Sequence, residues 1–303
     1  MPSFSIKTLR AEIQLGTGNF QGTSKNTYTI EGLAMSAKIE KVGLPDLNKC
    51  ELTIKGMKYE VMEQLTVLGF RKLTSAKNRL TLYGGTIGES LPVLFSGDIT
   101  KAVADFKNAP DIAFVISATT GAYSVKKAAP PLSVNGSTPA ADLAKQWAAE
   151  MGYSFKNAGV NIRVQNCIFN GSPMEKLRVL AEQYHIETII DDGEIIIQPR
   201  GEVRKTGTIP YLTDESGLAG YPSFTDKGIS LTALYNPDFK FGGKINVKSI
   251  VPRASGEWKI TKLTHSVSAI EKSAEWFSEI EGSWTGEDAV KNAGKKSKRK
   301  RNR

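Results

Sequence analysis

Apolar and polar residues alternate with a period of two along most of the first 120 residues. Leu80 and Leu82 alternate with polar neighbours, and Ile112, Phe114 and Ile116 repeat the pattern. Because successive side chains of a strand point to opposite faces, this alternation predicts strands with one buried face. Turn-forming residues separate the runs at positions 43–46, 84–85, 108–111 and 121. The pattern therefore predicts an antiparallel sheet or barrel.

One helix is predicted inside this β-rich segment. In Lys58–Leu68 the apolar residues Val61, Met62, Leu65 and Leu68 recur at helical spacing. Such spacing places them on one face of a helix.

Residues 127–136 are predicted to be a linker. They contain Pro130-Pro131 followed by Asn135-Gly136, and these dipeptides favour turns over regular structure. After them the pattern changes from alternation to a mixture of helical and extended segments. We therefore place the end of the first β-rich domain near residue 126.

The segment 137–200 predicts a small α/β module. A first helix is expected to begin at Pro139, with Thr138 as its N-cap, and to end before Gly152. Its apolar face includes Trp147, which we assign to the core. A second helix is expected to begin at Ser172-Pro173. Asp191-Asp192-Gly193 lies between two β-rich runs, which is a strong hairpin signal.

The segment after residue 200 returns to β-rich sequence. Its candidate strands are 229–235, 244–251, 257–267 and 275–284. No sequence repeat relates it to the first segment. The predicted fold class is mainly β with an α/β insert. The predicted division is 1–126 for the first β domain, 127–136 for the linker, 137–200 for the module, 201–287 for the second β domain and 288–303 for a disordered basic tail.

Charge is concentrated at one place in the sequence. The net charge is +9, from 40 Lys and Arg against 31 Asp and Glu. Eight of the basic residues lie in Lys291–Arg303, which contains no acid, so the rest of the chain has 32 bases against 31 acids. Such a segment attracts phosphates or acidic surfaces, and it also fits a solubilising tail. The candidate contact residues are Lys295, Lys296, Lys298, Arg299, Lys300, Arg301 and Arg303.

Several protein classes are disfavoured by the sequence. The longest uncharged stretch with apolar content, Ile112–Val125, is too short and too polar to span a bilayer. The first residues lack the apolar region of an export signal. The two cysteines, Cys50 and Cys167, form no CxxC motif, and there are only two histidines. We expect no membrane span, no disulfide framework and no metal, and we expect folding in a reducing cytoplasm.

Short motifs suggest no catalytic or cofactor site. Gly16-Thr17-Gly18-Asn19-Phe20-Gln21-Gly22 misses the spacing of a dinucleotide loop and is better explained as a hairpin loop. His185-Ile186-Glu187 lacks the Pro-Cys-x-x-Cys partner that zinc deaminases need. Asp191-Asp192 with Glu63 or Glu187 would supply two carboxylates, but nothing in the sequence places them across a cleft. We expect no catalytic residue and no cofactor.

Several stretches, in their order and spacing, resemble a known family over most of Met1–Trp284. The family is that of the baseplate hub proteins of contractile-tailed bacteriophages, the late-control protein D-like tail hub family. The stretches that carry the resemblance are Glu51–Gly56 leading into the helix at Tyr59–Leu68, Leu80–Gly85 followed by Leu94–Ile99, Gly256–His265, and Glu275–Gly282.

The resemblance implies two tail-tube-like β-barrel domains flanking the small α/β module. It also implies a homotrimer, in which six such domains cap the hexameric tail tube while the other side meets a trimeric spike. The protein would then be a structural component of the virion tail baseplate, assembled in the host cytoplasm, and not an enzyme. Its channel would pass the genome during ejection, and its partners would be the tube, the spike and other baseplate proteins.

Two other functions stay open at this point. One is a cell-wall hydrolase of the tail tip, although no catalytic constellation is visible. The other is a nucleic-acid-binding protein that acts through the basic tail, which the resemblance does not explain. That tail would contact DNA or a tape-measure protein.

Overall fold

The computed structural model describes residues 6–70, 77–107, 109, 112–126, 129–271 and 275–285. The chain divides into two compact units. Unit 1 comprises Met1–Glu202 with Thr264–Trp276, and unit 2 comprises Val203–Leu263 with the residues from Phe277 onward. Within the ranges just given, no helix has the length and apolar character needed to cross a membrane.

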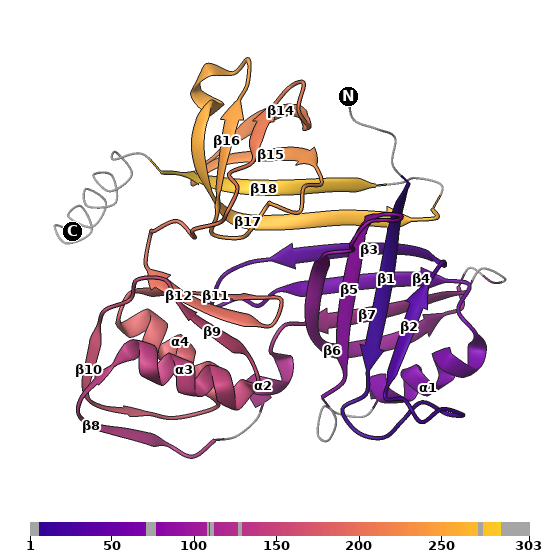
Figure 1. Ribbon diagram of the computed structural model, residues 1–303, viewed down its shortest axis with the longest axis horizontal. Coiled ribbons are helices and arrows are strands. Elements are labelled where there is room, and N and C mark those ends of the chain that lie inside the picture. The colour runs from indigo at the N-terminus through magenta and orange to yellow at the C-terminus, as the bar shows by residue number, and fades with distance from the viewer. Residues whose placement is uncertain are drawn as a thin grey trace. The chain divides into compact units, whose positions relative to one another are not determined.

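Unit 1 is built around an antiparallel sheet (Figure 1). The strands follow the order β17-β3-β4-β7-β6-β5-β1-β2, and over the described residues β2 lies at a free edge. The predicted mainly β architecture is confirmed. The sheet is open at the edge formed by β2. Its strands are β1 (Lys7–Gln14), β2 (Thr27–Glu31), β3 (Ala34–Lys41), β4 (Lys49–Lys55), β5 (Arg79–Thr86), β6 (Val93–Asp105), β7 (Ala113–Thr119) and the last part of β17 (Gly256–Ala269).

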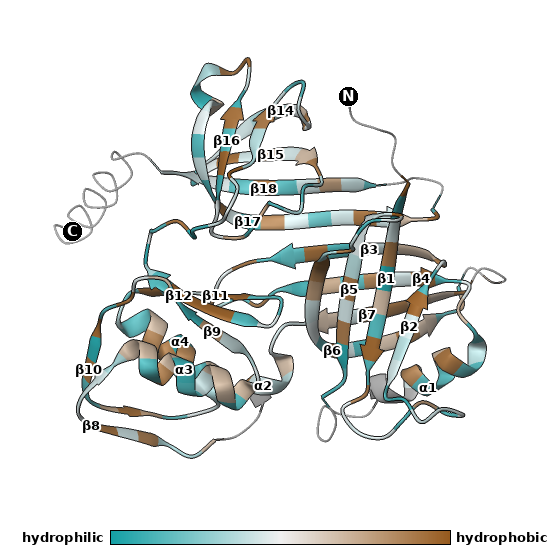
Figure 2. Ribbon diagram, in the orientation of Figure 1, coloured by the Kyte–Doolittle hydropathy of each residue, from teal (hydrophilic) through white to brown (hydrophobic). Residues whose placement is uncertain are grey.

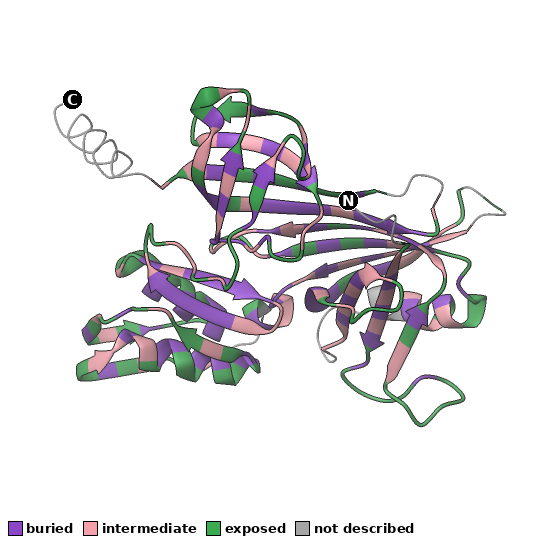
Figure 3. Ribbon diagram, turned by 45° about the horizontal axis from the view of Figure 1, so that its top comes forward, coloured by how far each residue is buried: buried purple, intermediate pink, exposed green. Residues whose placement is uncertain are grey.

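In β1, β3, β4, β5 and β7 the side chains alternate between a buried and a more exposed face, as the sequence predicts. Strand β6 differs, because Leu94–Ile99 are all buried, including the polar Ser96 and Asp98. Leu52 and Ile54 of β4 lie opposite Ile116 and Phe114 of β7, and all four side chains are fully buried. Hydrophobic and polar residues alternate along these strands in Figure 2, and buried and exposed residues alternate in Figure 3. The buried face forms the core of the β-rich part of unit 1.

Helix α1 (Tyr59–Phe70) is the helix predicted in this segment. Its apolar residues Met62 and Leu65 are buried, and the helix contacts β6. The apolar face predicted from the helical spacing is therefore the buried face of α1.

The α/β module lies in the same compact unit. Trp147 and Phe169 form an edge-to-face pair in its core, with ring centroids 5.1 Å apart. One small sheet has the order β11-β12-β9, and the other is a two-stranded ribbon of β8 and β10. A short helix, α2 (Ala122–Lys126), precedes the module. The elements of the module are β8 (Leu132–Pro139), α3 (Ala140–Met151), β9 (Ser154–Asn157), β10 (Arg163–Phe169), α4 (Pro173–Gln183), β11 (Ile186–Asp191) and β12 (Glu194–Pro199).

Three local predictions in the module are confirmed. Helix α3 ends at Gly152, which adopts a left-handed conformation with φ 78°. Helix α4 begins with a capping box, in which Ser172 and Glu175 each accept a hydrogen bond from the other's backbone N–H. Asp192 and Gly193 join β11 to β12 with positive φ angles of 46° and 95°, as a tight hairpin turn requires.

Two local predictions were wrong. Asn135-Gly136 does not interrupt regular structure, because it lies inside β8, where the register with β10 shifts and Asn166 Oδ1 accepts a hydrogen bond from Gly136 N. This turn-forming dipeptide therefore lies in an irregular part of the β8–β10 strand pair. Thr138 is not the N-cap of α3, because it belongs to β8. Pro139 takes that position, and Ala140 N donates to Ile162 O instead. The predicted domain boundaries as a whole stay a prediction.

Unit 2 holds the second β-rich segment. Its strand order is β14-β15-β18-β17, and β16 pairs with both β17 and β13. The sequence predicted four of these strands and missed β13 and β14. Strand β13 has three residues, and β14 contains Gly220 and Pro222 where its pairing with β15 is interrupted. The elements are β13 (Tyr211–Thr213), β14 (Leu218–Thr225), β15 (Gly228–Leu234), β16 (Lys244–Lys248), a 3₁₀ turn (Pro252–Ala254), the first part of β17 and β18 (Trp276–Trp284).

A buried ion cluster joins the sheet of unit 1 to the α/β module. Lys41, at the end of β3, is 3% exposed, and its Nζ lies 2.7 Å from Asp191 Oδ1 and 2.8 Å from Asp192 Oδ2. Burial alone would lower the pKa of Lys41, but the two carboxylates outweigh it and raise the pKa above its ordinary value. Asn48 lies beside this cluster, and its Nδ2 donates to Ile190 O at 2.7 Å.

A second polar contact holds the module from another side. Asp98 of β6 is 1% exposed and accepts a hydrogen bond from Tyr123 N through Oδ2. Lys77 Nζ donates to Met151 O at the end of α3. Burial, followed by the nearby Asp98 carboxylate, raises the pKa of Tyr153 to about 12. Asp98 thus holds α2, which leads into the module, and Lys77, just before β5, holds the end of α3.

We predict that Lys41→Met destabilises the protein by about 3–5 kcal/mol, because it leaves the Asp191 and Asp192 carboxylates without their buried counter-charge. Lys55→Met is the matched control. Lys55 pairs with Glu271 at 2.9 Å, but its side chain is 45% exposed, so the loss should stay within about 1 kcal/mol. Urea unfolding of both variants measures the difference. Equal losses would contradict a structural role for the buried cluster.

Candidate functional surface

The second face of the unit 1 sheet is polar, and we call it the polar face. Neighbouring strands present hydroxyl, lysine and glutamate side chains on the side opposite the core, and Val115 of β7 is an apolar residue in the same register. Strand alternation produces this face directly, since each buried residue is followed by one that points outward. The polar face consists of Ser36, Lys38 and Glu40 of β3, Lys49, Glu51, Thr53 and Lys55 of β4, Ser117 and Thr119 of β7, and Ser266 of β17.

Opposite charges on the polar face lie across from each other. Lys38 of β3 faces Glu51 of β4, and Glu40 faces Lys49. Cross-strand pairs of opposite charge stabilise a sheet modestly. With three lysines against two glutamates, the polar face has a small net charge, so it presents a hydrated surface without a strong attraction for either sign.

Two hollows lie along the polar face. One has a volume of about 490 Å³ and is lined by residues of β3, β4 and β17, including Ser36, Thr53 and Ser266. The other, of about 360 Å³, is lined by residues of β3, β4, β6 and β7 and includes Cys50. Burial raises the pKa of Cys50 above its ordinary value, so this cysteine is held as a thiol and is a poor nucleophile.

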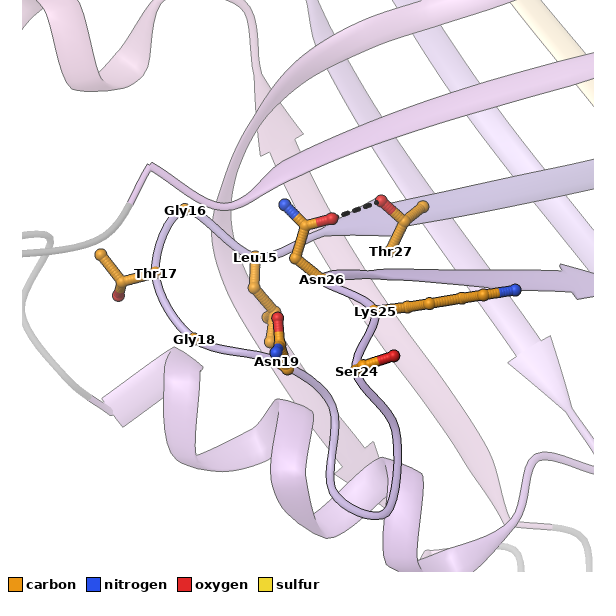
Figure 4. Close-up of a pocket in the computed structure, with 9 residues that line it drawn as sticks. All are labelled: Leu15, Gly16, Thr17, Gly18, Asn19, Ser24, Lys25, Asn26 and Thr27. Carbon is orange, nitrogen blue, oxygen red and sulfur yellow. Dashed lines mark hydrogen bonds between the residues drawn. The ribbon is translucent and has the colours of Figure 1, made fainter.

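The glycine-rich segment predicted to be a hairpin loop does join β1 and β2, which pair antiparallel (Figure 4). A pocket of about 480 Å³ is lined by residues 15–19 and 24–27. Asn78 Oδ1 accepts a hydrogen bond from Gly16 N, and Gln64 Oε1 accepts one from Gln21 N, so the loop is tied to neighbouring elements. Among the residues that line this pocket, Lys25 is the one with a charged side chain. The pocket therefore offers amide and hydroxyl groups rather than a catalytic pair.

The other candidate groups from the sequence have structural partners or lie apart. Asp191 and Asp192 pair with Lys41. Gln198 Nε2 donates to Glu187, and His185 is exposed in the turn before β11. Within the described part of the chain, no three His, Cys, Asp or Glu side chains gather in a way that could hold a metal ion.

The predicted anion contacts of the basic tail, from Lys295 to Arg303, lie outside the described residues. The polar face is the feature that the sequence reasoning did not single out. Its signal was present in the polar half of the alternation in Ala34–Lys41 and Lys49–Lys55. The sequence alone did not reveal which strands would be neighbours, and hence which charges would face each other.

Comparison with known families gives one match in sequence. The family described as baseplate hub gp41 matches residues 9–279 of this chain. No curated protein matches the chain significantly.

Solved structures resemble the chain in fold. A tail protein from Neisseria meningitidis MC58 aligns with a TM-score of 0.62 and 11% identity, over 91% of this chain and 98% of its own. The 43 kDa tail protein of prophage MuSo2 from Shewanella oneidensis gives 0.61 and 12%, over 93% and 97%. The E. coli c3393 protein, a type VI secretion component described as similar to T4 tail proteins gp27 and gp5, gives 0.55 and 8%, over 91% and 77%. At these identities the likeness concerns the fold.

Reversing one charge of the polar face tests its cross-strand pairing. Lys38→Glu places a carboxylate opposite Glu51 and should destabilise the protein by about 0.5–1 kcal/mol. The double variant Lys38→Glu/Glu51→Lys exchanges the two charges and should recover most of that loss. Thermal unfolding at low salt measures the two single variants, Lys38→Glu and Glu51→Lys, and the double variant. If the double variant were as unstable as the sum of the two single variants, the charges would not interact.

Proposed function

Because the chain belongs to the baseplate hub gp41 family, we propose that it is a trimeric adaptor between the hexameric tail tube and the trimeric spike. In this proposal the polar face lines the channel through which the genome is ejected. The observation that carries the proposal is the polar face itself, a sheet surface with paired charges and hydroxyl groups opposite a buried and mainly apolar face.

The chemistry of the polar face supports a channel role. A water-filled passage for a polyanion needs a surface that is well hydrated and that does not capture the polymer. Lys38, Lys49 and Lys55 are matched by Glu40, Glu51 and Glu271 on or beside the face. A patch dominated by lysine would bind DNA, whereas balanced charges leave little net attraction.

The two units support the proposed symmetry. Each contains strands that pair mainly antiparallel, in residues 7–119 with 264–269 and in residues 211–263 with 277–284, where β13 pairs parallel with β16. If each sheet takes the structural place of one tube subunit, three chains together present six such sheets to the six-fold tube. A heterologous contact between copies closes into a ring when its rotation is one third of a turn.

The proposed partners are the tail tube protein, the spike protein and other baseplate proteins. The likeness to the E. coli protein supports a spike partner, since that protein is described as similar to both gp27 and gp5. The family indicates a component of the virion tail. We place assembly in the host cytoplasm, which fits the two free cysteines, Cys50 and Cys167.

Catalysis is not part of the proposal. A cell-wall hydrolase of the tail tip is the competing function, and peptidoglycan zymography of the purified protein separates the two. A zone of lysis that persists in a preparation free of other tail proteins would overturn the structural assignment.

The oligomeric state is the first test. Sedimentation should give a mass of three chains for the protein alone and of three chains plus the spike trimer for the mixture. Negative-stain images should show a three-fold ring with a central hole. A strict monomer in both conditions would contradict the adaptor.

Cysteine labelling tests which surface faces the channel. In a Cys167→Ser background, Ser117→Cys places a thiol on the polar face and Lys145→Cys places one on the exposed side of α3. In the complex with tube and spike, Ser117→Cys should react with a small maleimide but not with a large polyethylene-glycol maleimide. Lys145→Cys, the control, should react with both reagents. Equal access of the large reagent to both sites would exclude a channel position for the polar face.

A further inference from the structure

We propose that Asn170 is a site of spontaneous deamidation, in which the backbone nitrogen of Gly171 attacks the side-chain amide carbon of Asn170. The chain contains the tripeptide Asn-Gly-Ser twice, at residues 135–137 and at residues 170–172. Because the reacting residues are the same in both copies, their reactivity in an unfolded chain should be closely similar. The fold makes them differ. The inference does not depend on the proposed function.

The reaction needs only the chain itself and water. Gly171 N loses its proton and bonds to Asn170 Cγ, while the bond from Cγ to Nδ2 breaks and ammonia leaves with that proton. Water then hydrolyses the succinimide ring at one of its two carbonyl groups. The product is aspartate or isoaspartate, and each carries a new negative charge. Glycine favours the attack because it has no side chain to hinder the approach of its nitrogen.

The dipeptide Asn170-Gly171 lies in the connection between β10 and α4 (Figure 1). Phe169, the residue before it, ends the pairing of β10 with β8, and Ser172, the residue after it, is the N-cap of α4. Asn170 and Gly171 are both exposed. Gly171 N donates to no acceptor among the described residues. Its nitrogen is therefore available for ring closure without the loss of a hydrogen bond.

The helix start requires glycine at position 171, so the reactive dipeptide cannot easily be avoided there. Gly171 has a φ of 95°, which favours glycine over residues with a side chain. A Cβ at this position would collide with the Glu175 carboxylate, whose Oε2 accepts a hydrogen bond from Ser172 N at 2.8 Å. The capping box that begins α4 thus places an unhindered nitrogen directly after Asn170.

The other copy of the tripeptide is held inside a strand pair. Val134 lies opposite Cys167 and Ser137 lies opposite Gln165, so β8 is paired with β10 on both sides of residues 135–136. Gly136 N donates to Asn166 Oδ1 at 3.0 Å. Attack on Asn135 would have to break this hydrogen bond and bend a strand that is fixed at both ends. We therefore expect Asn135 to react more slowly than Asn170.

A time course of the purified full-length protein tests the proposal. The protein is incubated in mildly alkaline buffer, digested with trypsin at intervals and analysed by mass spectrometry. Cleavage after Lys127, Lys145, Arg163 and Lys176 places the two sites on separate peptides, 128–145 and 164–176. Deamidation at Asn170 should be faster than at Asn135 by at least about two- to tenfold, the factor that corresponds to one neutral hydrogen bond. Equal rates in the folded protein would overturn the proposal.

The same time course in urea separates the effect of the fold from that of the local sequence. Once the chain is unfolded, the two sites should react at similar rates. If Asn170 kept its full advantage over Asn135 in urea, the local sequence and not the fold would set the order, and the structural argument would be overturned.

Two variants of Asn166 test the protection of Asn135. Asn166 has a φ of 45°, which glycine and aspartate both tolerate. Asn166→Gly removes the acceptor of Gly136 N and should bring the rate at Asn135 toward that at Asn170. Asn166→Asp, the matched control, keeps an acceptor oxygen and should leave Asn135 slow. No acceleration in Asn166→Gly would contradict the protection that we assign to this hydrogen bond.

Discussion

The two-faced sheet of unit 1 is the constraint on which the rest of the structure depends. Strands β3, β4 and β7 bury one set of residues, such as Leu52 and Ile116, so completely that the alternate set has only one direction in which to point. The same alternation therefore fixes both the stability of the sheet and the chemistry of its outer surface. A single insertion in β4 would exchange the faces and lose both properties at once.

The buried Lys41 cluster shows how a separate module is held against such a sheet. A charge at this depth is tolerated only because Asp191 and Asp192 lie within hydrogen-bond distance. Hydrophobic attraction is non-directional, so it specifies a docking position less sharply than charged hydrogen bonds do. The paired charges select one position, with Asn48 and Lys77 adding directional hydrogen bonds to the module's backbone.

Local sequence signals predicted much of the fold and little of the functional surface. The stripe in α1, the helix start at Ser172-Pro173 and the hairpin at Asp192-Gly193 are determined by neighbouring residues, so they could be predicted. Thr138 misled because a cap signal competed with strand pairing to β10, which is a long-range contact. Lys38 facing Glu51 and Lys41 meeting Asp191 depend on strand order and on pairs far apart in the chain, which periodicity does not encode.

Strand β14 has features that disfavour edge-to-edge association between copies of this protein. It ends the strand order of unit 2, and an open edge offers backbone groups that another chain can extend into a fibril. Pro222 lacks an N–H, and the interrupted pairing between Ala219 and Ser223 bends the edge out of register. Tyr221 and Phe224 are exposed beside it. The edge therefore offers aromatic side chains for a contact, but its backbone is a poor template for the repeated addition of strands.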